Sequence, residues 1–219
     1  MSANKKMKIV WNLPNILTMF RVVLIPPVLI LIYLDDWVSL IAASILYAVS
    51  AITDALDGKI ARKLNQQSEF GAFLDPLADK FLVLGCYLVF SLKPEMGIPV
   101  WLIVLMALRD IWITWLRSVC IRKNIKFTTS LLAKAKTIVQ MVGAALLLIL
   151  MLLYRVYAHS VNLAASDYLT IAQAMFGGAG EWLIYFPLIL TSAIVLFTLY
   201  TGLDYYIRIR ESEKGAHDA

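Results

Sequence analysis

Residues 133–154 read AKAKTIVQMVGAALLLILMLLY, and this stretch decides the fold class of the chain. After its two lysines it carries no charge, and about 20 apolar residues are enough for a helix to cross a bilayer. Five similar runs, separated by polar or turn-forming residues, lie at about 15–34, 39–60, 73–91, 98–118 and 183–206. We therefore expect an all-α, polytopic membrane protein with six transmembrane helices.

The composition indicates that lipid is part of the solvent. Of the 219 residues 61% are hydrophobic, whereas a soluble domain is about 45–50% apolar. The excess is too large for one buried core. We expect a single membrane domain over residues 1–219, with a short N-terminal interfacial segment at 1–14, an extracytoplasmic loop at 155–182 and a cytoplasmic tail at 207–219.

Lysine and arginine are concentrated in the loops of one side. The N-terminus, the connections after the second and fourth spans, and the C-terminus are basic, whereas the opposite loops hold only Lys93 and Arg155. Because basic loops stay in the cytoplasm, we expect both termini there. The net charge of +5 follows from this asymmetry, so we expect no nucleic-acid partner.

Four carboxylates gather where the second span ends and the third begins. Asp54 and Asp57 are three residues apart, and Asp75 and Asp79 are four apart, so each pair occupies one face of its helix. A short link makes the two helices antiparallel neighbours, which allows the two faces to meet. Four such acids at the edge of a bilayer are costly to bury without partners.

Facing carboxylates repel one another unless a cation lies between them. Hard oxygen ligands suit Mg²⁺, Mn²⁺ or Ca²⁺, and two metals that bridge phosphate oxygens are a common arrangement for displacement at phosphorus. The same acids could instead be solvated in a loop. A cation transporter is a further alternative, but its acids would be spread through the depth of several spans.

The acids belong to a longer pattern, Asp-x2-Asp-Gly-x2-Ala-Arg-x8-Gly-x3-Asp-x3-Asp, over residues 54–79. This pattern resembles the signature of the CDP-alcohol phosphatidyltransferase family at every specified position. Further likeness to the bacterial phosphatidylglycerophosphate synthases of that family lies at 12–21, 70–80, 107–110, 116–117 and 134–141. Two features depart from it: Asp110 stands where Glu is usual, and the loop at 155–182 is long.

The resemblance implies a role for each candidate residue. Asp54, Asp57 and Asp75 would bind a divalent metal, with Asp79 a further ligand or the general base, and two Mg²⁺ or Mn²⁺ ions are expected. The residues expected on the CDP side are Gly58, Ala61, Arg62, Thr18 and Arg21. Those expected around the acceptor's phosphate are Arg109, Arg117, Lys134 and Lys136.

Physical arguments bear on several of these assignments. Arg109 lies inside an apolar span and is eight residues before Arg117, so both share a helix face. A buried arginine needs an anionic partner, which a substrate phosphate would supply. Lys134 and Lys136 could instead extend to the lipid headgroups. Arg62 could hold a diphosphate or act as a positive-inside anchor.

The resemblance implies transfer of a phosphatidyl group from CDP-diacylglycerol to sn-glycerol 3-phosphate, which gives phosphatidylglycerophosphate and CMP. It also implies a homodimer among the membrane lipids of a bacterial inner membrane, with the active site facing the cytoplasm. Inositol phosphate, phosphatidylglycerol and serine are alternative acceptors, and the basic residues argue against serine. A prenyltransferase would repeat Asp-Asp-x-x-Asp, which is absent.

Overall fold

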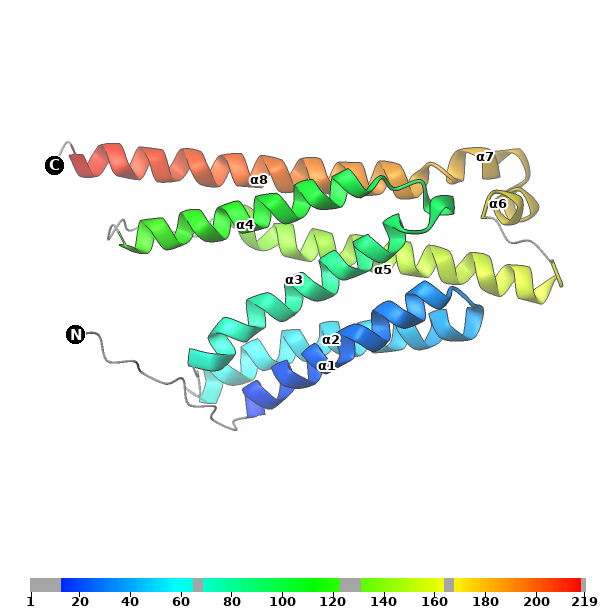
Figure 1. Cartoon of the computed structure of the whole chain (residues 1–219), viewed down its shortest axis with the longest axis horizontal. Helices are drawn as coiled ribbons and strands as arrows, with labels where there is room; N and C mark the ends of the chain where they lie inside the picture. Colours follow the sequence, from blue (N-terminus) through cyan, green and yellow to red (C-terminus); the bar gives the residue numbers. More distant parts are fainter. Residues whose placement is uncertain (1–12, 65–68, 123–130, 164–167, 218–219) are drawn as a thin grey trace.

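The computed structural model describes residues 13–64, 69–122, 131–163 and 168–217, with side chains at 16–54, 78, 80–120, 122, 135–163 and 168–211. Within these ranges every regular element is a helix, and six helices are long (Figure 1). They are α1 (Leu13–Leu34), α2 (Trp37–Leu64), α3 (Glu69–Ser91), α4 (Val100–Arg122), α5 (Leu131–Ser160) and α8 (Phe186–His217). The expected all-α architecture is confirmed.

The long helices alternate in direction, so the bundle has two distinct ends (Figure 1). The start of α1 at Leu13 and the end of α8 at His217 share one end, which we call the terminal end. The opposite end holds the tight turn between α1 and α2, and we call it the turn end. The end of α2 and the start of α3 lie at the terminal end, as do the end of α4 and the start of α5.

Four stretches of the described residues are long and apolar enough to cross a bilayer. They are Ile16–Leu34, Trp37–Asp54, Ala135–Ser160 and Tyr168–Glu211. In α3 the apolar stretch is shorter, Lys80–Ser91, and α4 carries Arg109, Asp110 and Arg117 along its length. Many Leu, Ile, Val and Trp side chains are exposed on the outside of the bundle, as expected of helices whose surroundings are lipid.

α5 lies at the centre of the packing. It contacts α2, α3 and α8, while α1 packs against α2 and α3, and α4 packs against α3 and α8. The hydroxyl of Tyr47 donates to the carbonyl of Met141 at 2.8 Å, and that of Tyr87 donates to the carbonyl of Gln140 at 3.2 Å. These bonds follow from the scarcity of water in a lipid-facing bundle, where a buried hydroxyl needs a partner from the protein.

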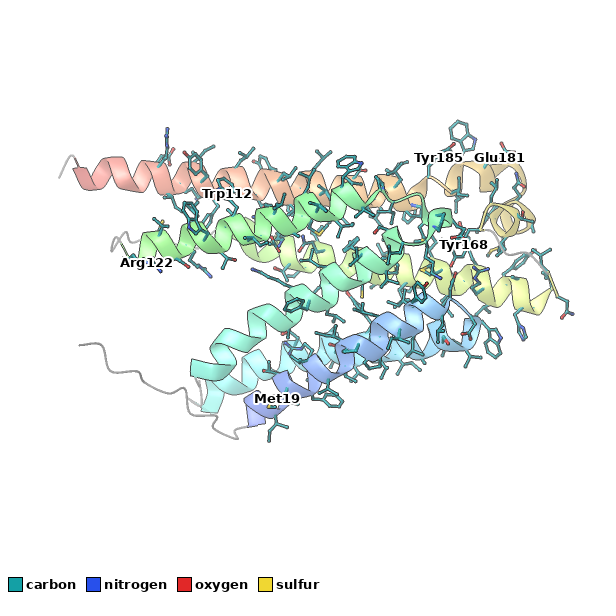
Figure 2. All side chains as sticks on the ribbon, viewed as in Figure 1. Met19, Trp112, Arg122, Tyr168, Glu181 and Tyr185 are labelled. Atoms are coloured by element: carbon teal, nitrogen blue, oxygen red, sulfur yellow. The ribbon has the colours of Figure 1, made fainter. Side chains whose placement is uncertain are left out.

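The region expected to be a loop, 155–182, is instead mostly helical where it is described. α5 continues through Arg155 to Ser160, and α6 (Tyr168–Phe176), η2 (Gly177–Ala179) and α7 (Gly180–Leu183) follow. These elements cover the turn end, with Tyr168 toward the long helices and Glu181 and Tyr185 on the outer side (Figure 2). A β-carbon at Gly180 would lie 2.3 Å from the carbonyl oxygen of Ala172 in α6, so only glycine allows this packing.

A carboxylate at the turn end neutralises Arg155 within α5. Asp35 adopts a left-handed backbone conformation (φ 58°) between α1 and α2. One oxygen of Asp35 is 2.7 Å from Nη2 of Arg155, and the other accepts a 2.6 Å hydrogen bond from the Tyr168 hydroxyl. Lys93, after α3, is 3.6 Å from the same carboxylate. Asp35 thereby connects α5, α6 and the α1–α2 turn.

The neighbouring Asp36 has a simpler role at the start of α2. Its carboxylate accepts backbone N–H groups from Val38 and Ser39 at 3.1 and 3.0 Å, as an N-cap residue does. Hydrogen bonds from Ser39, those of its side chain first, hold the pKa of Asp36 below its usual value. Asp36 is exposed and makes no described contact with α5 or α6.

We expect Asp35→Asn to lower the free energy of unfolding by about 1–3 kcal/mol, because Arg155 and Lys93 lose their shared anion. Asparagine tolerates the left-handed conformation, so the backbone is not strained by the change. Thermal unfolding of the purified protein in detergent measures the effect. Asp36→Asn is the matched control, since asparagine caps a helix equally well. Equal melting temperatures for the two variants would contradict the role given to Asp35.

Candidate active site

The predicted carboxylates lie at the terminal end of α2 and α3. Asp54 and Asp57 are on the last turns of α2, and Asp75 and Asp79 are on the first turns of α3. Only four residues connect these helices, so their ends lie close together. The side chains of Asp57, Asp75 and Asp79 fall outside the described residues, as do those of Gly58, Ala61, Arg62 and Lys134. Their convergence on a metal therefore stays a prediction.

Asp54 is the described member of the predicted metal set. Its Oδ1 is 2.8 Å from Nη1 of Arg21 in α1, whose side chain is only 1% exposed. Thr18, one turn earlier on α1, is equally buried. Among the described side chains no three of His, Cys, Asp and Glu gather as a metal site. The structure thus places Arg21, predicted on the CDP side, in direct contact with a predicted metal ligand.

A second polar cluster joins α4 and α5. Nζ of Lys136 lies 2.5 and 2.6 Å from the two oxygens of Asp110, and Nη1 of Arg109 is 3.2 Å from Oδ1 of the same residue. All three residues are at least nine-tenths buried. Arg109 and Lys136, both predicted to contact the acceptor's phosphate, are therefore brought together, and a residue of this chain holds them.

The cluster extends to α8 through hydroxyl groups. Nη2 of Arg109 donates to Oγ1 of Thr201 at 2.9 Å, and that hydroxyl donates to the carbonyl of Thr198 at 2.8 Å. Nε2 of Gln140 in α5 donates to Oγ1 of Thr198 at 3.2 Å. Sequence analysis did not assign a role to either threonine. The available signal was that Thr198 and Thr201 are three residues apart in a largely apolar span and so share a helix face.

The cluster carries a surplus of positive charge. Arg109 and Lys136 supply two cations, and Asp110 is the one carboxylate that contacts them among the described residues. A buried net charge is costly in a low dielectric, and a bound anion would relieve that cost. The arrangement can therefore receive an anionic group such as a phosphate.

Arg117 lies apart from this cluster. It is exposed near the terminal end of α4 and lies near Tyr205, one turn beyond Thr201 on α8. Arg109 and Arg117 thus both lie against α8, at different depths. Trp112, between them on α4, contacts Tyr206 of α8 (Figure 2).

Lys80 connects the acidic and the basic halves of the site. It directly follows Asp79 in α3, and its Nζ donates to Oγ1 of Thr114 in α4 at 2.9 Å. Thr114 in turn donates to the backbone carbonyl of Asp110 at 2.7 Å. A short chain of hydrogen bonds therefore links the helix that carries Asp75 and Asp79 to the basic cluster. The sequence predicted no role for Lys80, which is only the last residue of the family likeness at 70–80.

Comparison with known proteins places this arrangement in a family. The family model for CDP-alcohol phosphatidyltransferase matches residues 11–202. The chain belongs to the CDP-alcohol phosphatidyltransferase family. The matched range runs from before α1 to Gly202 in α8, so it includes both the Arg21–Asp54 pair and the Arg109 cluster.

Curated relatives carry a more specific name, CDP-diacylglycerol–glycerol-3-phosphate 3-phosphatidyltransferase. The protein of that name from Rickettsia bellii is 36% identical over 143 residues, which cover 65% of this chain and 78% of the relative. The one from Escherichia coli K12 is 40% identical over 146 residues, 63% of this chain and 77% of the relative. The protein named CDP-diacylglycerol–glycerol-3-phosphate 3-phosphatidyltransferase 2 from Arabidopsis thaliana is 36% identical over 149 residues, which cover 63% of this chain and 64% of the relative.

In this CDP-alcohol phosphatidyltransferase an apolar groove of about 700 Å³ lies along α1, α3 and α4. It begins beside Val22 and Ala78, the sequence neighbours of Arg21 and Asp79, and extends to Leu88 toward the turn end. Several of its lining residues are exposed on the outside of the bundle. The groove therefore gives an apolar path from the charged helix ends into the membrane-spanning part of the protein.

We expect Arg21→Met to lower the free energy of unfolding by roughly 1–3 kcal/mol, because it leaves Asp54 without its ion pair. The side chain of Asp54 is 29% exposed, so water compensates part of the loss of a buried pair. Thermal unfolding in detergent measures this change. Arg208→Met removes an exposed pair with Asp204 on α8 and should leave the melting temperature unchanged. An equal shift in both variants would show that burial of Arg21 adds nothing to the pair.

Proposed function

We propose that this protein transfers a phosphatidyl group from CDP-diacylglycerol to sn-glycerol 3-phosphate, which gives phosphatidylglycerophosphate and CMP. Family membership and the names of the curated relatives support the reaction. The observation that carries the acceptor is the cluster of Arg109, Asp110 and Lys136, since its surplus positive charge suits a substrate with its own phosphate.

On the donor side, the carboxylates of Asp54, Asp57, Asp75 and Asp79 would hold Mg²⁺ or Mn²⁺, two ions in all. Their oxygen donors suit these hard cations, and Asp54 meets the requirement of access because it is partly exposed beside Arg21. When bound, the metals would neutralise the diphosphate and polarise the phosphorus under attack. The residues assigned to the CDP group itself are Gly58, Ala61, Arg62, Thr18 and Arg21.

The chain's own residues then act on the acceptor. Arg109 and Lys136 hold its phosphate and orient its hydroxyl, and Arg117 and Lys134, nearer the helix ends, add positive charge that attracts the anion. The carboxylate of Asp79 takes the hydroxyl proton as the oxygen attacks the phosphorus that carries the diacylglycerol. A new oxygen–phosphorus bond forms while the bond from that phosphorus to CMP breaks, so transfer is a direct displacement and CMP leaves.

The site would face the cytoplasm of a bacterial inner membrane. Six long helices of alternating direction support six crossings with both termini on one side. The basic ends of α2, α4 and α5 lie at the terminal end, as expected beside cytoplasmic loops. Soluble CMP and glycerol 3-phosphate can exchange there, while the groove beside Val22 and Ala78 takes apolar chains of the lipid. A homodimer, which the family resemblance implies, is part of the same proposal.

An inositol phosphate is the competing acceptor, because it too would bring a phosphate to the basic cluster. A panel assay separates the candidates: purified protein receives CDP-diacylglycerol with glycerol 3-phosphate, inositol phosphate, phosphatidylglycerol or serine, and CMP release is followed. We expect glycerol 3-phosphate to give by far the highest kcat/KM. A higher value with any other acceptor would overturn the assignment, and no CMP release with any of the four would overturn the reaction.

We expect EDTA to abolish transfer and excess Mg²⁺ or Mn²⁺ to restore it, because the four carboxylates and the diphosphate would repel each other without a cation. The measurement is the initial rate of CMP release before and after chelation. Thermal unfolding in EDTA is the control that the protein stays folded. A rate that persists in EDTA would remove the metal from the proposal.

A further inference from the structure

We propose that Asp110, Thr201 and Gly202 are positioning residues that hold the Arg109 guanidinium and the Lys136 ammonium group as one receptor for the acceptor's phosphate. The proposal rests on the function proposed above, in that the acceptor carries a phosphate. The positioning roles come from three contacts within the α4–α5–α8 junction.

The first contact is the carboxylate of Asp110. Its Oδ1 receives both Nζ of Lys136 at 2.5 Å and Nη1 of Arg109 at 3.2 Å, so the two cations are neighbours. Two like charges in a buried site repel each other strongly, and a shared anion is what keeps them close. Among the described residues Asp110 is the one carboxylate that contacts these cations, and it cannot neutralise both, so we expect the junction to attract a further anion.

The second and third contacts fix Arg109 against α8. Oγ1 of Thr201 accepts Nη2 of Arg109 at 2.9 Å. A β-carbon at Gly202 would lie 3.0 Å from Nε and 3.3 Å from Cγ of Arg109, so the arginine side chain runs directly along the backbone of α8. Nε is buried and has no hydrogen-bond partner among the described residues, as expected where it faces this backbone. A side chain at position 202 would push the guanidinium away from Thr201.

The contact with Arg109 therefore explains why position 202 is a glycine. Inside a helix glycine is less favourable than alanine, but at position 202 the absence of a side chain leaves the space that Arg109 occupies. Substitution of a residue that only connects helices would change the stability of the protein and nothing else. A residue that positions a phosphate receptor would in addition change the KM for the acceptor and leave the KM for the lipid donor unchanged.

The test compares Asp110→Asn, Asp110→Glu, Gly202→Ala and the wild type in the CMP-release assay, with Mg²⁺ present and each substrate varied while the other is saturating. Loss of one charge-assisted contact is worth about 1.5–3 kcal/mol, so we expect the KM for glycerol 3-phosphate to rise at least about tenfold in Asp110→Asn. The KM for CDP-diacylglycerol should stay within about twofold. Asp110→Glu keeps the charge and should recover most of the affinity.

Gly202→Ala keeps the test decisive if Asp110→Asn does not fold. Its added methyl group meets only the flexible side chain of Arg109, so the fold should tolerate it while the KM for glycerol 3-phosphate rises several-fold. The matched control is Gly178→Ala, an exposed position where a β-carbon meets nothing within 4 Å. It should leave both KM values unchanged.

An unchanged KM for glycerol 3-phosphate in Gly202→Ala and in folded Asp110→Asn, even with a lower melting temperature, would overturn the positioning roles. Failure of the proposed function has a different signature, because the wild-type protein itself would then prefer another acceptor or release no CMP.

Discussion

A charged side chain inside a lipid-facing helical bundle must find a partner of opposite charge, and this constraint fixes the arrangement of the long helices. Three ion-pair groups satisfy it at three levels of the molecule. Arg21 and Asp54 join α1 to α2 near the terminal end. Asp110 joins α4 to α5 through Lys136. At the turn end Asp35 holds Arg155 and draws in α6. Apolar packing alone would specify these registers less well, because lipid is as apolar as the helix surfaces.

The groups differ in their surroundings more than in their charge, since among the described residues Asp35 and Asp110 each contact two cations. The carboxylate of Asp35 contacts Arg155, Lys93 and the Tyr168 hydroxyl under a cover of short helices, which suits a fixed structural junction. The other two groups lie farther toward the terminal end, where α2 and α3 carry the family signature. Asp54 is partly exposed beside its arginine, and the Arg109 cluster holds one cation more than its carboxylate neutralises. We propose that the metal and the phosphate groups bind in this half of the bundle and not at the turn end.

The sequence predicted most ends of the six long helices within a few residues, because long apolar runs and polar breaks are local properties. It ended the last span at 206, whereas α8 continues to His217. It placed the end of the fifth helix too early, at 154, since the residue that neutralises Arg155 is Asp35, 120 positions away. It also predicted that Arg109 would need an anion, but a substrate was the only candidate considered. The partner of Arg109 is the adjacent Asp110, which also contacts Lys136 because α5 packs there. The role proposed for Gly202 depends on the side chain of Arg109 running along α8. Such roles depend on helix packing, which no local pattern reveals.

We propose that the acids of α2 and α3, which would bind the metal, and the cations of α4 and α5, which would bind the acceptor's phosphate, lie on opposite sides of one active site. An experimental structure of the protein with Mn²⁺, CDP-diacylglycerol and glycerol 3-phosphate, with manganese located by anomalous scattering, tests it most directly. The account predicts manganese among Asp54, Asp57 and Asp75, and the acceptor's phosphate in contact with Arg109 and Lys136. Manganese away from these helix ends would contradict it. So would a phosphate bound elsewhere while the Arg109 cluster stays unchanged.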